Sequence, residues 1–213
     1  MKKKKTILAA LVLLLVVAVG GAIAYFTDTD ENTNIFTIGN VDITLTEPNW
    51  DTTDTTPANS IPDVAENLMP GETVAKDPTI NNKSTKSEAY VFAKVVVPCT
   101  TETTPKEIFT YDVNDDKWTE LSSAAVACTS GGNATHVYYY GTEGTLTELA
   151  KATNDTTPTP TSKPVFDEVT VLSTLKGTEG LTGNKNIVVT GYGIQSKGLA
   201  STIPATVWGY FSN

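Results

Sequence analysis

Apolar and polar residues alternate over short runs along most of the chain, and a period of two predicts β-strands. The clearest run is Tyr90 to Val97, which is rich in β-branched and aromatic residues. A bulge or bend at Gly39-Asn40 joins two further runs, Phe36 to Ile38 and Val41 to Leu45. The other predicted strands are Val74–Ile80, Phe109–Val113, Trp118–Leu121, His136–Tyr140, Val165–Leu172 and Asn186–Gln195.

Turn and loop signals separate these strands. Glu47–Pro62 and Thr153–Pro164 are rich in Thr and Pro and are predicted to be long loops, and Asn81–Ser87 is predicted to be a polar turn. Val113–Lys117 has the composition of a hairpin turn between its neighbouring strands. A short helix is expected in Thr142–Ala152 or in the C-terminal tail. Many short strands with few helix signals predict an all-β fold, a jelly-roll-like β-sandwich.

The first residues have a different pattern from the rest of the chain. Four lysines, Lys2 to Lys5, precede the apolar run Ile7–Val19, which is short for a membrane span. Gly20-Gly21 interrupts this predicted helix, and Ala22-Ile23-Ala24 has the small-x-small pattern that a signal peptidase accepts. The pattern predicts a signal peptide, and the alternative is an uncleaved membrane anchor.

A cut after Ala24 divides the chain into three parts. Residues 1–24 are the signal peptide, and Tyr25 becomes the new N-terminus. Residues 25–34 form a flexible N-terminal arm, and residues 35–213 form a single β-sandwich domain, a size that one hydrophobic core can support.

The charge balance restricts the partners. The 213 residues carry a net charge of −9, and removal of the four leader lysines lowers it to −13. The sequence contains no Arg. Nucleic acids and anionic lipid surfaces both require clustered cations, so neither is an expected partner. Contact with a membrane is expected only through the signal peptide before cleavage.

Cys99 and Cys128 are the two cysteines. Export would permit a disulfide between them, which would stabilise the fold by roughly 3–4 kcal/mol through loop closure. The alternative is two buried thiols.

Catalytic motifs are absent from the sequence. A zinc protease motif of the H-E-x-x-H type needs two histidines, whereas His136 is the only one. It lies beside a predicted strand and is expected to be a strand-edge residue. No G-x-S-x-G, Walker or Rossmann pattern occurs. We therefore expect neither an enzyme nor a cofactor.

Oxygen-bearing side chains alternate near the predicted N-terminus. Asp28, Asp30, Asn32 and Asn34 have the spacing at which a calcium loop begins. Thr33 and Gly39 stand where an EF-hand needs Gly and Glu, so the alternative is a polar arm without a metal.

Three stretches resemble the TasA/camelysin (CalY) family, secreted biofilm-matrix proteins of Gram-positive bacteria that a SipW-type signal peptidase processes. The first is the leader through "GGAIAYFTDTDENTNIFTIGNVDITLTEPNW". The second is "NLMPGETVAKDPTINNKSTKSEAYVFAKV", and the third is "NIVVTGYGIQSKG" with "VWGYF". The middle of the chain, Cys99 to Lys185, carries no resemblance.

The resemblance implies a jelly-roll protein that polymerises with copies of itself into extracellular fibres. The freed N-terminal segment of one subunit would add a strand to the sheet of the next. The donor would lie within Tyr25 to Ile38, with Tyr25, Phe26, Ile35 and Phe36 as candidate donor residues. It also implies a SipW-type peptidase as processing partner, an accessory anchoring protein, and a location in the extracellular matrix or on the cell surface. The alternatives are a monomeric cell-surface adhesin and a camelysin-like metalloprotease.

Overall fold

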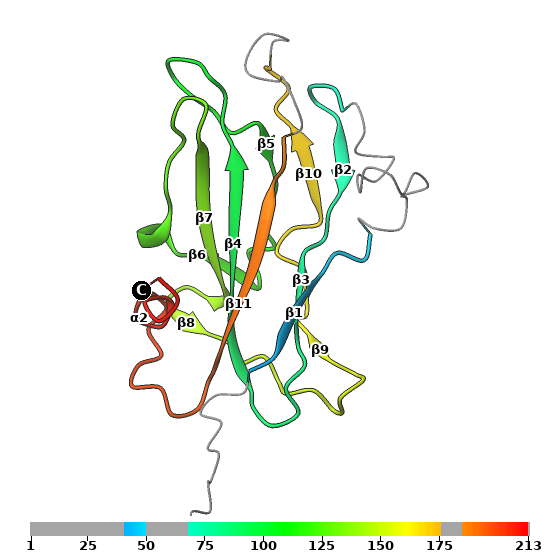
Figure 1. Cartoon of the computed structure of the whole chain (residues 1–213), viewed down its shortest axis with the longest axis vertical. Helices are drawn as coiled ribbons and strands as arrows, with labels where there is room; N and C mark the ends of the chain where they lie inside the picture. The colour runs from blue at the N-terminus through cyan, green and yellow to red at the C-terminus, as the bar shows by residue number, and fades with distance from the viewer. Residues whose placement is uncertain (1–40, 50–67, 176–184, 213) are drawn as a thin grey trace, which may run out of the picture. The chain divides into compact units, whose positions relative to one another are not determined.

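β-Strands carry nearly all the regular structure in the part of the chain that the structure describes (Figure 1). The computed structural model describes residues 41–49, 68–175 and 185–212, and all of them belong to the unit Ile38–Asn213. The elements are β1 (Ile43–Thr46), β2 (Thr73–Ala75), β3 (Thr79–Asn82), β4 (Ala89–Pro98), β5 (Phe109–Thr110), β6 (Trp118–Glu120), the 3₁₀ turn η3 (Ser122–Ala124), β7 (Asn133–Thr142), β8 (Thr145–Leu146), β9 (Thr159–Pro160), β10 (Glu168–Val171), β11 (Val188–Gln195) and the helix α2 (Pro204–Trp208).

The described strands form three antiparallel sheets. The large sheet has the order β11-β4-β7-β6, with β8 paired to one end of β7. The first small sheet has the order β1-β3-β9, and the second small sheet has the order β2-β10-β5. Figure 1 shows the two small sheets following one another along the face of the large one.

A shared hydrophobic core lies between the large sheet and the small sheets. Alternate residues of β4 point into it, among them Val91 and Val95, and they meet Ile80 of β3 and Val169 of β10. All four side chains are buried because each layer covers the apolar face of the other. The predicted all-β sandwich is confirmed.

The opposite face of the large sheet is also covered. Phe92 of β4 and Tyr139 of β7 point outward and pack with Val207 and Trp208 of α2. Pro204 starts this helix, a position where its missing N–H is not needed. The tail was one of the two expected places for a short helix, and residues 142–152 instead contain β8.

Two details differ from the sequence prediction in Val74–Ser87. The predicted strand Val74–Ile80 is wrong, since Lys76–Pro78 divides it into β2 and β3, which belong to different small sheets. Lys76 N–H donates to Asp167 at 3.0 Å as the chain changes sheet. Asn82 belongs to β3 and is fully buried. Its side-chain amide can be buried because it forms hydrogen bonds with the backbone of Ser84, Ser87 and the β8–β9 connection.

The predicted hairpin at Val113–Lys117 is also wrong. A turn exists there, since the N–H groups of Lys117 and Trp118 both donate to the carbonyl of Asn114. The strands on its two sides do not pair, because β5 joins β10 and β6 joins β7. The chain thus crosses from one layer to the other between β5 and β6. Trp118, at the start of β6, is 1% exposed because its ring packs into the core.

Candidate functional site

Most of the sequence-predicted site residues lie outside the described residues. These are the cleavage-site residues Ala22, Ala24 and Tyr25, the donor candidates Tyr25, Phe26, Ile35 and Phe36, and the calcium candidates Asp28, Asp30, Asn32 and Asn34. Their roles stay predictions.

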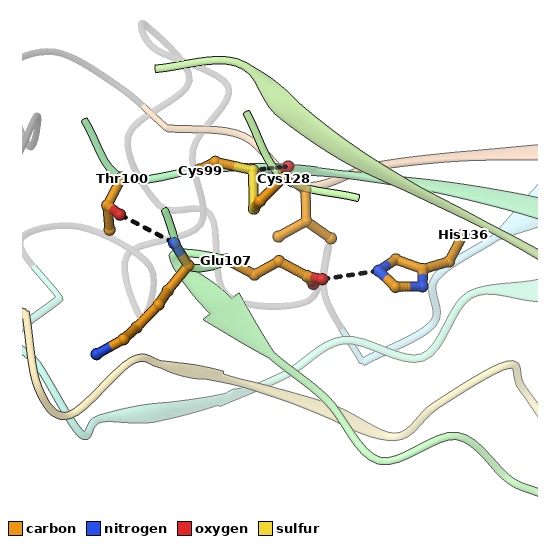
Figure 2. The surroundings of a disulfide bond; sticks show 7 residues. Cys99, Thr100, Glu107, Cys128 and His136 are labelled. Atoms are coloured by element: carbon orange, nitrogen blue, oxygen red, sulfur yellow. Dashed lines mark hydrogen bonds and ion pairs between the residues drawn. A yellow bond between two sulfur atoms is a disulfide. The ribbon is translucent and has the colours of Figure 1, made fainter. Parts of the chain in front are cut away.

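The structure joins Cys99 and Cys128 in a disulfide, with the two Cα atoms 5.8 Å apart (Figure 2). Cys99 follows β4, and Cys128 lies before β7. The backbone supports the same connection, because Cys99 N–H donates to Gly132 at 2.9 Å. On its other side the backbone of Cys99 forms an isolated antiparallel β-bridge with the backbone of Glu107.

His136 is not a strand-edge residue, contrary to the sequence expectation. It lies inside β7 and faces the second small sheet, where Figure 2 shows Glu107 reaching it. Its Nε2 is 2.8 Å from Glu107 Oε1, and its Nδ1 is 2.8 Å from Glu120 Oε1. The ring stacks on Tyr138 and meets the edge of Tyr111.

The two carboxylates change the chemistry of the imidazole. The hydrogen bonds that the ring donates to the carboxylates of Glu107 and Glu120 raise the pKa of His136 to about 9, against an opposing effect of burial. At neutral pH the ring is therefore a cation between two anions. Burial raises the pKa of Tyr138 to about 12 and also raises the pKa of Tyr111, so both phenols stay neutral.

Sequence reasoning missed Glu107 and Glu120. They lie 29 and 16 positions from His136, outside any local spacing motif. Strand alternation offered a partial signal, since it places His136 and Tyr138 on one face of β7. The register that sets Glu120 opposite Tyr138 is seen only in the folded structure.

These residues do not fit a catalytic zinc centre. Such a centre takes three protein ligands with free lone pairs, often two of them histidine. Both nitrogens of the chain's single histidine face carboxylates, and both cysteine sulfurs are in the disulfide. Within residues 41–49, 68–175 and 185–212, no group of three or more His, Cys, Asp or Glu side chains could hold a metal ion.

One edge of the large sheet lacks a partner strand among the described residues. β11 pairs with β4 on one side, and no described strand pairs with its other side. Ser196 N–H donates to Glu88 at 3.0 Å, so by alternation the backbone groups of Val189, Gly191 and Gly193 point away from β4. Edges of this kind are the usual sites of strand addition.

β1 lies against the inner face of this edge strand. A Cβ atom on Gly193 would come within 2.8 Å of Ile43 Cγ2, and one on Gly191 within 3.3 Å of Ile80 Cδ1. The two glycines thus let β1 and β3 approach β11 closely. Because Gly191 and Gly193 alternate along the sequence, both lie on the same face of β11 and leave that face without side chains at these positions.

No helix among the described residues has the length and apolar character needed to cross a membrane.

The fold and these contacts define an all-β sandwich with a histidine ion-pair bridge between its layers and an edge strand open among the described residues. The chain belongs to the camelysin metallo-endopeptidase family, whose model matches residues 1–179. This match confirms the TasA/camelysin resemblance and extends it over most of the middle region. Comparisons with curated proteins and with solved structures gave no match.

Proposed function

We propose that this chain is a secreted structural protein of a Gram-positive bacterium that polymerises into extracellular, biofilm-matrix fibres. A SipW-type peptidase cuts after Ala24 and frees the arm Tyr25–Asn34. The arm of one subunit then adds a strand to the sheet of the next subunit. An uncut leader keeps the arm at the membrane, so cleavage starts assembly.

The edge of β11 is the observation that supports this proposal most directly. Its outward N–H and C=O groups can hydrogen-bond an incoming strand, which gives main-chain affinity without a deep pocket. Donation from each subunit to the next does not close into a ring and therefore produces a filament. The net charge of −13 after cleavage favours solubility before assembly.

Electron microscopy of protein that begins at Tyr25 tests the proposal. We expect filaments from this protein and none from a variant that lacks Tyr25–Asn34. Val189→Pro tests the edge strand that would receive the arm, because it removes one outward N–H of β11 and spares the hydrogen bonds to β4. This variant should fold, by circular dichroism, and fail to polymerise. Protein that stays monomeric at every pH and concentration, with and without the arm, would contradict the proposal.

The family description names a metallo-endopeptidase, which makes proteolysis the second candidate. The donor set argues against it here, since a zinc ion would have to displace a carboxylate from His136 to gain even one imidazole ligand. Casein cleavage that a chelator abolishes and that His136→Ala also abolishes would establish this activity. We expect no cleavage by the purified protein.

A further inference from the structure

A row of polar side chains crosses between the layers of the sandwich from β7. His136 meets Glu107, Tyr138 Oη lies 3.1 Å from Tyr111 Oη, and Tyr140 Oη lies 2.8 Å from Ser162 Oγ. The first of these contacts is ionic and lies beside the disulfide (Figure 2). It is the contact on which the proposal rests.

The contact joins three separate parts of the chain. Glu107 lies two residues before β5 of the second small sheet, His136 belongs to β7, and Glu120 ends β6. We call the set Glu107–His136–Glu120 the Glu–His–Glu bridge. Both carboxylates lie 2.8 Å from a ring nitrogen, so both sides of the imidazole carry a short ionic contact.

With both carboxylates ionised, a doubly protonated ring satisfies this geometry on both sides. An imidazolium donates from both nitrogens, whereas a neutral imidazole has one donor and one lone pair. In the neutral ring that lone pair would face a carboxylate at 2.8 Å, which is repulsive. One proton therefore decides whether the bridge attracts on both sides or on one.

We propose that the Glu–His–Glu bridge is a proton-dependent fastener between the two layers of the sandwich. Loss of one of the two ring protons in alkali loosens the segment Cys99–Glu107 from β7, while the disulfide keeps that segment attached. Reattachment of the proton restores the closed form. The device works in each subunit and does not depend on the proposed polymerisation.

The groups around the ring set the pH window. Glu107 and Glu120 are the charged groups whose influence reaches His136, and the two phenols beside it, Tyr111 and Tyr138, remain neutral. Folding raises the pKa of His136 from its ordinary 6.5 to about 9. The stabilisation is therefore complete below the lower value and is lost as pH rises through the upper one.

The disulfide sits at the same place and acts on the same segment. The backbones of Cys99 and Glu107 form an isolated β-bridge, and the backbone N–H of Lys106 donates to the hydroxyl of Thr100 at 3.0 Å. Cys128 holds this strand end to the stretch before β7. Opening in alkali should thus be local and reversible in the oxidised protein, and wider after reduction.

NMR titration of the imidazole tests the protonation step, and the single histidine makes its signals unambiguous. We expect a midpoint near pH 9 in the full chain. Glu107→Gln and Glu120→Gln should each move the midpoint toward 6.5. A wild-type midpoint between about 6 and 7, the ordinary range for histidine, would overturn the proposal.

Amide hydrogen exchange at pH 7 locates the loosening. His136→Gln should speed exchange in Cys99–Glu107 by roughly tenfold, as expected when a charge-assisted hydrogen bond is lost, and leave β11 unchanged. Equal acceleration in both places would contradict a local fastener. Glu107→Gln, which leaves the ring in place and removes its ionic contact with the segment, gives the same readout if His136→Gln does not fold.

Urea midpoints at pH 7 and pH 10 then separate the proton from the side chain. The wild type should unfold at higher urea than His136→Gln at pH 7, and this gap should close at pH 10. A gap that persists at pH 10 would mean that the ring acts by packing alone, which overturns the proposal.

Discussion

The two faces of β7 stabilise the sandwich in different ways. On the inner face His136, Tyr138 and Tyr140 each place a polar atom against a partner in the facing layer. On the outer face Val137 and Tyr139 pack against apolar side chains that include Leu121, Leu146 and Val207. One strand thus carries directed contacts on one side and mostly undirected packing on the other.

The difference separates specificity from bulk stability. Hydrogen bonds depend on distance and direction, so the inner row fixes which residues of the two layers stand opposite one another. Apolar packing depends chiefly on area and volume, so the outer cluster contributes most through contact with Phe92 and the tail. Substitutions on the outer face should therefore cost more free energy, and those on the inner face should affect register and pH response.

Phe92→Ala is the largest expected effect and tests the outer face. Phe92 is fully buried, and its ring lies 5.5 Å from Trp208 and 5.7 Å from Phe211. Truncation leaves a cavity and should lower the free energy of unfolding by about 3–5 kcal/mol, measured by urea denaturation. Phe92→Leu should cost less than about 2 kcal/mol. Equal losses for both variants would show that the cluster does not depend on volume.

The double variant Cys99→Ala with Cys128→Ala tests a contribution that belongs to neither face. The disulfide spans 29 positions, and a loop of that size stabilises by about 3–4 kcal/mol through the unfolded chain. Reduction of the wild type should produce the same loss in urea denaturation. A much smaller loss would indicate that the backbone bonds of Cys99 and Gly131 already hold this end.

Gly191 and Gly193 of β11 test how closely the two layers approach one another at the edge of the inner face. Gly193→Ala would bring a Cβ atom to 2.8 Å from Ile43, whereas the nearest contact at Gly191 is 3.3 Å. Overpacking should cost about 1–3 kcal/mol at Gly193, and Gly191→Ala should cost less. Both glycines lack a positive φ, so any difference reflects the approach of β1 and not backbone strain. Thermal unfolding of the pair measures it, and equal costs would contradict the close approach.

Local sequence pattern predicts most of the fold. Tyr90–Val97 is apolar on both faces and forms β4, the central strand that is covered on both sides. The pattern fails where the chain changes from one sheet to another. In Val74–Ile80 the alternation continues while the chain moves between two small sheets, and in Val113–Lys117 the turn composition is right although the strands do not pair.

The Glu–His–Glu bridge could not be predicted in the same way. Its three members come from different segments, and only the pairing of β6 with β7 and the position of β5 in the opposite layer bring them together. Long-range contacts of this kind depend on the completed fold. The cleavage site, the donor arm and the calcium candidates lie in residues 1–40, outside the described residues, and stay predictions.

Tyr140→Phe is the smallest expected effect and tests whether the inner row acts through direction. The hydroxyl lies 2.8 Å from Ser162 Oγ and accepts the N–H of Ser162 at 3.3 Å. The ring also packs against Trp118 and is kept in the variant, so only the hydrogen bonds are lost. Because Ser162 is exposed and can bond water instead, the loss should be about 0.5–1.5 kcal/mol.

Tyr90→Phe is the matched control for Tyr140→Phe on the outer face. Tyr90 is equally buried, and its hydroxyl makes no hydrogen bond to another described residue. Its removal should leave the urea midpoint unchanged within error. If both variants lose the same free energy, the hydroxyls matter only through packing, and the contrast between the two faces of the large sheet fails. A loss at Tyr140 alone would show that its hydrogen bonds to Ser162, and not the packing of the ring, carry the effect.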